Sequence, residues 1–190
     1  MHRSIERTLD GGEAPSDTFG AWWVAYLARF PGREPFRTEM PLRSDAGLCL
    51  TGVVDAIFWD PSPAPPGAPL TLHLVDWKRS ESIVEGSPNY VLGCLQLNVY
   101  RFLLEEYYDG FVVDGVRRGK TSVGTMSIVV FRGTADGWES LGVPCMQTSV
   151  REMVRSRRLD LARSGGAGKA AAGARDTPGQ SNHACGGCRQ

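Results

Sequence analysis

Residues 70–80 read L-T-L-H-L-V-D-W-K-R-S, and the fold and chemistry of the chain are worked out from this stretch. The apolar run from Leu70 to Trp77 predicts a buried β-strand. Because side chains alternate along a strand, Asp76 and Lys78 are expected on the same face of the sheet. An acid and an amine are therefore predicted to lie together at the end of a buried strand.

The preceding strands carry a second acid. A run from Arg37 to Leu42, a turn near 44–47 and the apolar run 48–59 predict a hairpin. Asp55 stands in the middle of the second run, where an unpaired ionised carboxylate is costly to bury. It needs a cation, a hydrogen-bond donor or water. The segment 61–69 (P-S-P-A-P-P-G-A-P) predicts an exposed loop, so the three strands form a meander.

Helical patterns flank these strands. Apolar residues recur at helical spacing in four segments, and a further buried strand with a short partner follows the third of them. The helices are expected over 1–10, 16–30, 90–108 and 147–161, and the strand over 122–131. This order predicts an α/β fold with one mixed central sheet flanked by helices.

The chain has 190 residues, which predicts one folded domain over 1–163. The Gly/Ala-rich tail, 164–190, has no large apolar side chain and is expected to be disordered. Hydrophobic residues make up 42% and charged residues 22%, which excludes a fibre or a wholly disordered protein. Lys plus Arg equals Asp plus Glu at 21 each, so net charge indicates no general attraction to nucleic acid.

The sequence has neither a long apolar run nor the pattern of a secretory signal. We therefore expect a soluble, intracellular protein without a membrane partner, with nucleus and cytoplasm both open. The five cysteines, an odd number, lie partly in apolar segments. This favours free thiols over a disulfide framework.

Two carboxylates on neighbouring strands, Asp55 and Asp76, are suitable oxygen ligands for Mg²⁺ or Mn²⁺. A lysine beside them, Lys78, can orient water or stabilise charge on a phosphate, which is the equipment of phosphodiester hydrolysis. The alternative is an ion pair between Asp55 and Lys78 at the edge of the sheet, because buried charges are usually paired.

Gln96 and Tyr100 lie four residues apart in the predicted helix 90–108, so an amide and a phenol project from one face. Taken alone, this spacing is equally typical of the polar face of an ordinary helix. Its meaning depends on the acids and the lysine that precede it.

Together these segments resemble the PD-(D/E)XK nuclease superfamily, in its RecB-like branch with a Gln-x-x-x-Tyr motif. The chain is also similar to nuclease-like proteins of giant viruses and protists. The resemblance covers about residues 1–160. It rests on M-H-R-S-I-E at 1–6, G-V-V-D at 52–55, V-D-W-K-R-S at 75–80 and L-Q-L-N-V-Y at 95–100.

The resemblance implies a restriction-endonuclease-like core and a role for each matching residue. Metal ligands would be His2, Asp55, Asp76 and the backbone carbonyl of Trp77. Lys78 matches the catalytic lysine. Gln96 and Tyr100 match the helical motif that holds the site and the nucleic acid. Arg79 would add a phosphate contact, and Glu39 resembles an accessory acid of the first strand.

The implied function is Mg²⁺- or Mn²⁺-dependent hydrolysis of DNA, single- or double-stranded, in replication, recombination or repair, within a larger assembly where one exists. Exonuclease and endonuclease action both stay open. Some members carry an iron–sulfur cluster on four cysteines. Here Cys185, Cys188 and His183 fall short of that set, and no cluster is expected. The alternative is a catalytically impaired nuclease fold that binds nucleic acid or a protein partner.

Overall fold

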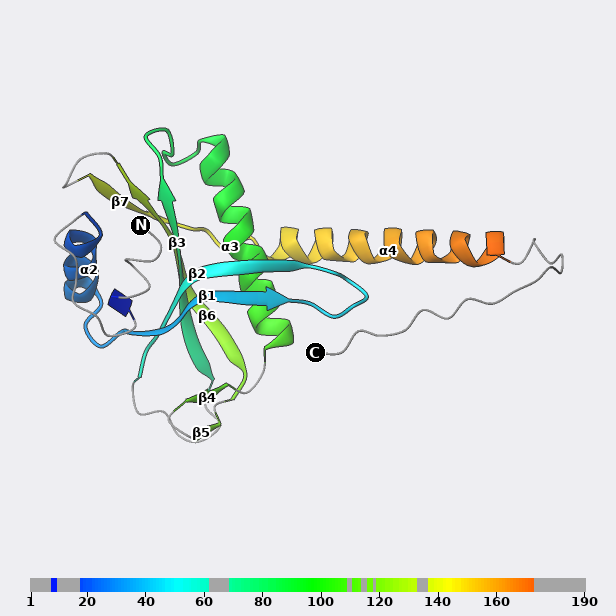
Figure 1. Ribbon diagram of the computed structural model, residues 1–190, viewed down its shortest axis with the longest axis horizontal. Coiled ribbons are helices and arrows are strands. Elements are labelled where there is room, and N and C mark those ends of the chain that lie inside the picture. Colours follow the sequence, from blue (N-terminus) through cyan, green and yellow to red (C-terminus); the bar gives the residue numbers. More distant parts are fainter. Residues whose placement is uncertain are drawn as a thin grey trace, which may run out of the picture.

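The computed structural model describes residues 8–9, 18–61, 69–108, 111–113, 116–117, 119–132 and 137–172. The chain folds into one main sheet with helices packed on it (Figure 1). The elements are α2 (Thr18–Arg29), β1 (Glu34–Arg43), β2 (Thr51–Trp59), β3 (Leu70–Arg79), α3 (Pro88–Tyr107), β4 (Val112–Val113), β5 (Val116–Arg117), β6 (Thr121–Phe131), β7 (Trp138–Gly142) and α4 (Gln147–Ala172).

The main sheet has five strands in the order β1-β2-β3-β6-β7. The meander β1-β2-β3 is antiparallel, β6 runs parallel to β3, and β7 returns antiparallel to β6. The parallel pair requires a crossover connection, and α3 lies within it. The predicted α/β fold with one mixed sheet is confirmed. The small β4–β5 hairpin was not predicted from the sequence.

The two faces of the sheet carry separate apolar cores. On one face α2 contributes Trp22 and Tyr26, which pack with Trp77 and Phe131 of the sheet. The rings of Trp22 and Trp77 meet edge to face with centroids 4.7 Å apart. The prediction that the aromatic stripe of α2 packs on a sheet is confirmed, as is the end of the helix before Pro31-Gly32.

On the opposite face α3 packs against the sheet (Figure 1). Its first turn is capped by Ser87, whose hydroxyl accepts a hydrogen bond from the Tyr90 amide at 3.3 Å, and Pro88 follows at the start of the helix. Gly93 allows close contact with β6, because an added Cβ would lie 2.7 Å from Cδ1 of Ile128. The helix expected over 90–108 is confirmed, with shifted ends.

Strands β2 and β3 separate after four paired positions. Their ladder runs from Trp59↔Leu72 to Ala56↔Val75 and stops there, although β2 continues back to Thr51 beside β1. Beyond this point the β1–β2 hairpin crosses α3, while β3 continues beside β6 (Figure 1). We call the point of separation the fork. Asp55 and Asp76 occupy the next position on its two arms.

Strand β2 changes orientation at the fork. Val54 packs in the core under α3, whereas Ala56, two residues later, packs in the core under α2. Residues two apart on a regular strand share a face, so the strand is irregular at Asp55. Glu39, opposite Asp55 in the β1–β2 register, has the left-handed φ of 46°. The irregularity therefore involves both strands.

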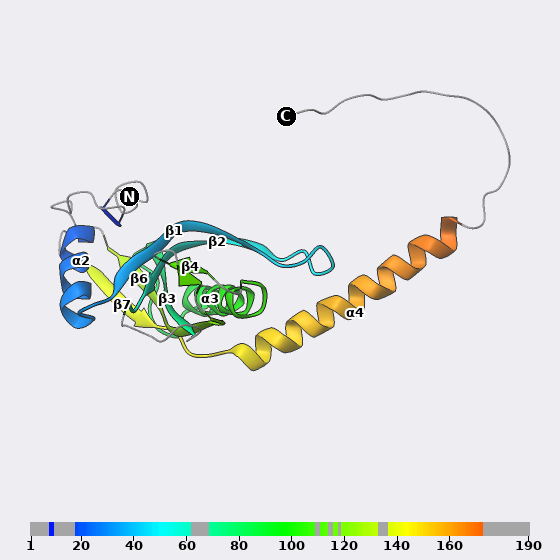
Figure 2. The same ribbon diagram turned by 90° about the horizontal axis from the view of Figure 1, so that it is seen from below.

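Helix α4 continues beyond its predicted end. It was expected to finish at Leu161, with disorder from Ser164, but it runs to Ala172 and extends away from the sheet (Figure 2). The segment Ala170–Ala172 consists of alanine, the strongest helix former, which favours continuation. Residues 173–190 lie outside the described part of the chain. No described helix has the length and apolar character needed to cross a lipid bilayer.

A buried amide fixes the start of α4 against α3. Asn98 is fully buried, and its Nδ2 donates to the carbonyls of Cys94 and Pro144 at 2.9 Å each. Its Oδ1 accepts from the amide of Met146 at 2.7 Å. The side chain therefore joins α3 to the segment that leads from β7 into α4.

Replacing Asn98 with leucine should leave the Pro144 carbonyl and the Met146 amide without their partner. The free energy of unfolding should fall by about 2–4 kcal/mol, because each buried group left unsatisfied costs about 1–3 kcal/mol. Asn89→Leu, at an exposed position of the same helix, is the matched control. Urea denaturation measures both variants, and equal loss in the two would contradict the assignment.

Candidate metal and nucleic-acid site at the fork

Asp76 and Lys78 form an ion pair on the α3 face of β3. Lys78 Nζ lies 2.8 Å from Asp76 Oδ2 and 3.1 Å from Oδ1. Asp76 is 2% exposed, whereas a third of the Lys78 side chain is accessible to solvent. The shared face predicted from strand alternation is confirmed. The pairing places a positive charge at the mouth of a buried carboxylate.

The carboxylate of Asp55 lies between the arms of the fork. Its Oδ2 accepts a hydrogen bond from the backbone amide of Trp77 at 2.8 Å. Trp77 is the residue between Asp76 and Lys78, so Asp55 reaches the same short segment of β3. The expectation that Asp55 needs a donor is confirmed. The Asp55 carboxylate therefore accepts the hydrogen bond that a backbone carbonyl of β2 would accept if the β2–β3 ladder continued.

Glu39, the predicted accessory acid, lies opposite Asp55 on β1. It is exposed, and its positive φ is costly for a residue with a side chain, by about 1–3 kcal/mol. Such strain tends to collect where a fold holds functional groups in place. Three acids, Glu39, Asp55 and Asp76, thus occupy successive positions across β1, β2 and β3.

Gln96 and Tyr100 meet each other and β2. Gln96 Nε2 donates to the hydroxyl of Tyr100 at 2.8 Å, and the Tyr100 ring is buried. An added Cβ at Gly52 would overlap this ring, so the glycine of G-V-V-D makes room for it. Tyr100 therefore packs on β2 three residues before Asp55. The prediction that the pair shares one helix face is confirmed.

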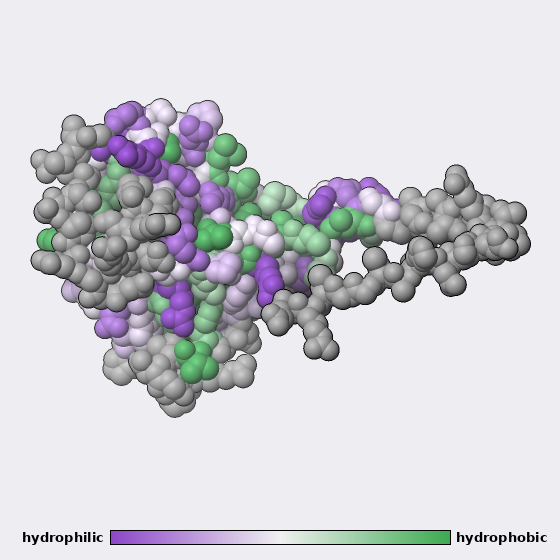
Figure 3. Space-filling view, viewed as in Figure 1, coloured by the Kyte–Doolittle hydropathy of each residue, from purple (hydrophilic) through white to green (hydrophobic). Residues whose placement is uncertain are grey.

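The pair borders a shallow hollow of about 300 Å³ between the hairpin, α3 and α4. Leu92, Leu95 and Met153 supply apolar walls, and Thr51 lies at the hairpin edge. Apolar side chains also gather on the visible face where α4 leaves the body (Figure 3). The hollow gives the amide and the phenol access to the surface near the fork.

Of the remaining predicted residues, some lie in the described part of the chain and others do not. Arg79 is exposed at the end of β3. His2, Cys185, Cys188 and His183 lie outside the described residues. The backbone amide of Trp77 donates to Asp55, as described above. The role of the Trp77 carbonyl as a metal ligand stays a prediction. In the described part of the chain, no group of three or more His, Cys, Asp and Glu residues is placed to hold a metal ion.

The donor set at the fork nevertheless suits one class of ion. Mg²⁺ commonly binds through one or two carboxylates and keeps several waters, so two acids meet its requirement. Asp55 and Asp76 present carboxylate oxygens from adjacent strands, the kind of donor that Mg²⁺ prefers. A transition metal that needs a closed set of protein ligands would fit less well.

The sequence reasoning missed a second polar cluster, on the α2 face. His73 is buried in β3, its Nε2 lies 3.0 Å from Asp60, and its Nδ1 lies 2.8 Å from the Thr125 hydroxyl. Arg33 approaches both Asp60, at 3.4 Å, and Thr125, at 3.3 Å. The signal was present, since a histidine interrupts the apolar run L-T-L-H-L just as Asp55 interrupts β2.

The hydrogen bonds of His73 define its protonation. The backbone amide of Thr125 donates to Nδ1 at 3.2 Å, so that nitrogen is unprotonated and Nε2 carries the hydrogen directed at Asp60. Burial lowers the pKa of His73 below its ordinary value, more than the Asp60 carboxylate raises it. His73 is therefore a neutral imidazole that joins β3 and β6 to the chain after β2.

A scan against models of known protein families finds none that matches this chain. A search of curated proteins likewise finds no similar protein.

Gly52→Ala should displace the Tyr100 ring and lower the free energy of unfolding by about 1–3 kcal/mol, as overpacking does. Gly142→Ala is the control, because an added Cβ there meets nothing within 4 Å. In a Tyr100→Leu background the cost of Gly52→Ala should shrink. Chemical denaturation of the wild type and these variants measures the cost, and an unchanged cost in the Tyr100→Leu background would contradict the contact.

His73 should make stability depend on pH. Its pKa is lower in the folded chain, so as pH falls below about 6.5 the unfolded chain takes up a proton first, and stability is lost. The added slope is at most about 1.4 kcal/mol per pH unit. Unfolding measured from pH 7 to 5 should show a shallower decline in His73→Gln, and parallel curves for the two chains would refute the assignment.

Proposed function

We propose that this chain is a metal-dependent deoxyribonuclease with a PD-(D/E)XK-type core, which hydrolyses DNA phosphodiester bonds at the fork. The observation that carries the proposal is the convergence of three groups on one segment of β3. Asp76 and Lys78 are ion-paired at 2.8 Å, and the Asp55 carboxylate accepts a hydrogen bond from the amide between them. This combination has the charge and donor types that phosphoryl chemistry requires.

The arrangement of the elements also supports the proposal. An antiparallel meander, a crossover helix and a parallel fourth strand bring both acids to the point where the sheet opens. The opening matters, because a closed ladder would leave no space beside the two carboxylates. The sequence resemblance to RecB-like nucleases independently selects the same residues.

Each residue has a distinct task in this proposal. Asp55 and Asp76 would hold Mg²⁺ or Mn²⁺, and the ion when bound supplies an activated water and neutralises charge on the phosphate. Lys78 would turn its partly exposed ammonium from Asp76 toward a phosphate oxygen. Gln96 and Tyr100 would contact the DNA strand where it passes the hollow beside α3.

The Asp76–Lys78 pair can also be explained as a salt bridge with a purely structural role. This explanation favours the alternative function, a nuclease fold that binds nucleic acid without cutting it. A buried pair is held by its own Coulomb attraction and needs no metal. The two readings differ in what happens when one partner is removed. Loss of Lys78 should abolish chemistry in the enzyme but should only change binding in a non-catalytic module.

Lys78→Ala and Asp76→Asn should each reduce DNA cleavage with Mn²⁺ or Mg²⁺ by at least about a hundredfold, because charge stabilisation and proton transfer contribute this much. The assay uses linear, circular and single-stranded DNA with the full chain. Arg157→Ala and Glu152→Gln, on the exposed surface of α4, are matched controls and should cleave like the wild type.

Two outcomes would count against the enzyme hypothesis. Cleavage that survives in both fork variants would point to a contaminating enzyme and end the proposal. A wild-type chain that binds DNA in a salt-sensitive way without cutting it would favour the binding module. Circular dichroism shows whether Asp76→Asn and Lys78→Ala keep the fold, and Lys78→Arg, which keeps a positive charge beside the buried Asp76 carboxylate, serves where either does not.

A further inference from the structure

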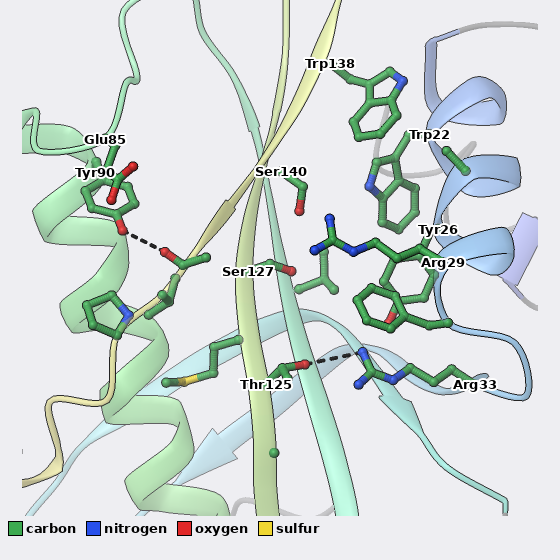
Figure 4. A pocket seen from close by; sticks show the side chains of 18 of the residues that line it. Trp22, Tyr26, Arg29, Arg33, Glu85, Tyr90, Thr125, Ser127, Trp138 and Ser140 are labelled. Carbon is green, nitrogen blue, oxygen red and sulfur yellow. Dashed lines mark hydrogen bonds between the residues drawn. The ribbon is translucent and has the colours of Figure 1, made fainter.

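A second cleft of the described structure encloses about 670 Å³. It lies between α2 on one side and strands β6 and β7 on the other, and it extends past the edge of β6 to Glu85, Tyr90 and Arg101. Figure 4 shows side chains from α2 and from the two strands facing each other across it. This volume is in the range of small-molecule sites. We call it the α2 cleft.

Aromatic side chains form one part of its wall. Trp22, Tyr26 and Phe30 come from the α2 side, and Trp138 comes from β7. Phe30 is already covered by the Arg33 guanidinium, 4.0 Å from the ring centroid. Trp138 is only half-buried and lines the cleft, so its indole offers a surface on which a planar ring can stack.

The charge in the cleft is positive near α2. Arg29 is exposed, its guanidinium points from α2 into the cleft in Figure 4, and no carboxylate in the described part of the chain pairs with it. Arg33 is ion-paired with Asp60, and Arg101 with Glu105, so their charges are largely offset. Arg29 is therefore the group most available to an anion.

One buried hydroxyl in the cleft, that of Tyr26, lacks a hydrogen-bond partner among the described residues. Tyr26 is 7% exposed, and its hydroxyl makes no hydrogen bond with described residues, although the Arg33 charge lies near enough to favour the phenolate. Burial outweighs that charge and raises the pKa of Tyr26, so the group stays a neutral hydroxyl. Ser127 and Ser140 also line the cleft across from Arg29 (Figure 4).

We propose that the α2 cleft binds a nucleotide. The base would stack on Trp138, the phosphate would pair with Arg29, and the Tyr26 and serine hydroxyls would bond to the phosphate or sugar. A buried hydroxyl without a partner costs about 1–3 kcal/mol, so a ligand that bonds to Tyr26 recovers this loss. The part of the cleft formed by Arg29, Tyr26 and Trp138 lies on the α2 face of the sheet, opposite the Asp76–Lys78 pair, and the proposal stands without the nuclease proposal.

Isothermal titration calorimetry of the full chain with the four deoxynucleoside 5′-monophosphates tests the proposal. EDTA is present, so that no metal at the fork can hold the phosphate. We expect saturable binding of the nucleotides and weaker binding of the deoxynucleosides and of inorganic phosphate. A further titration is carried out in the presence of a 5′-phosphorylated trinucleotide. If the trinucleotide competes with the mononucleotide, the ligand of the cleft is the 5′ end of a DNA strand. If it does not compete, the ligand is a free nucleotide.

Arg29→Gln should weaken nucleotide binding about ten- to hundredfold, in line with the loss of a charge-assisted hydrogen bond. Tyr26→Phe, which keeps the ring, should weaken it several-fold. Arg157→Gln, at an exposed arginine of α4, should leave it unchanged. No saturable binding by any nucleotide, or equal affinity in Arg29→Gln and Arg157→Gln, would overturn the proposal.

Discussion

The hydrogen bond from the Trp77 amide to the Asp55 carboxylate is the interaction on which the fork depends. The β2 residues that precede Ala56 do not pair with β3, so the Trp77 amide of β3 has no backbone partner on β2. A buried N–H without a partner is costly, and a carboxylate acceptor gives a bond worth about 1.5–3 kcal/mol. Asp55 therefore allows the sheet to open without an orphaned amide. The same residue that would bind a metal also stabilises the opening in which the metal would bind.

This double role has a consequence for the ion pair beside it. Asp76 is buried, and a lone buried carboxylate would be strongly destabilising. Lys78 offsets this charge while keeping a third of its side chain in solvent. The site is thus charge-compensated before any ligand arrives, and a divalent cation and a phosphate together would replace that internal pairing. The opening of the sheet depends on the hydrogen bond between Asp55 and β3, and the charge of Asp76 is compensated by Lys78 of the same strand.

Much of this arrangement could be predicted from residues alone. The period-two run of β1, the apolar runs of β2 and β3 and the long apolar stripe of α3 predicted a mixed sheet with helices packed on it. The alternation of Asp76 and Lys78 predicted a shared face, and the contact at 2.8 Å bears that out. The cost of burying Asp55 predicted that its carboxylate needs a cation, a hydrogen-bond donor or water, and the structure shows a donor. The identity of that donor could not be predicted, because it depends on where two strands separate, a property of three-dimensional register.

Other features were beyond local patterns for definite reasons. The pairing of His73 with Thr125 joins residues 52 positions apart through a parallel register that no neighbouring sequence encodes. The length of α4 was underestimated because the segment 164–190 has no large apolar side chain to pack in a core, while its alanines at 170–172 favour helix. The α2 cleft arises from two elements that are distant in the chain, and no motif marks it.

The most direct measurement of the central claim is anomalous diffraction from crystals soaked in Mn²⁺. We expect a single strong peak at the fork, about 2.0–2.2 Å from a carboxylate oxygen of both Asp55 and Asp76, and its loss in Asp76→Asn. A wild-type crystal in which the ion binds elsewhere, or in which the Asp76–Lys78 ion pair persists and no ion binds at saturating Mn²⁺, would contradict it.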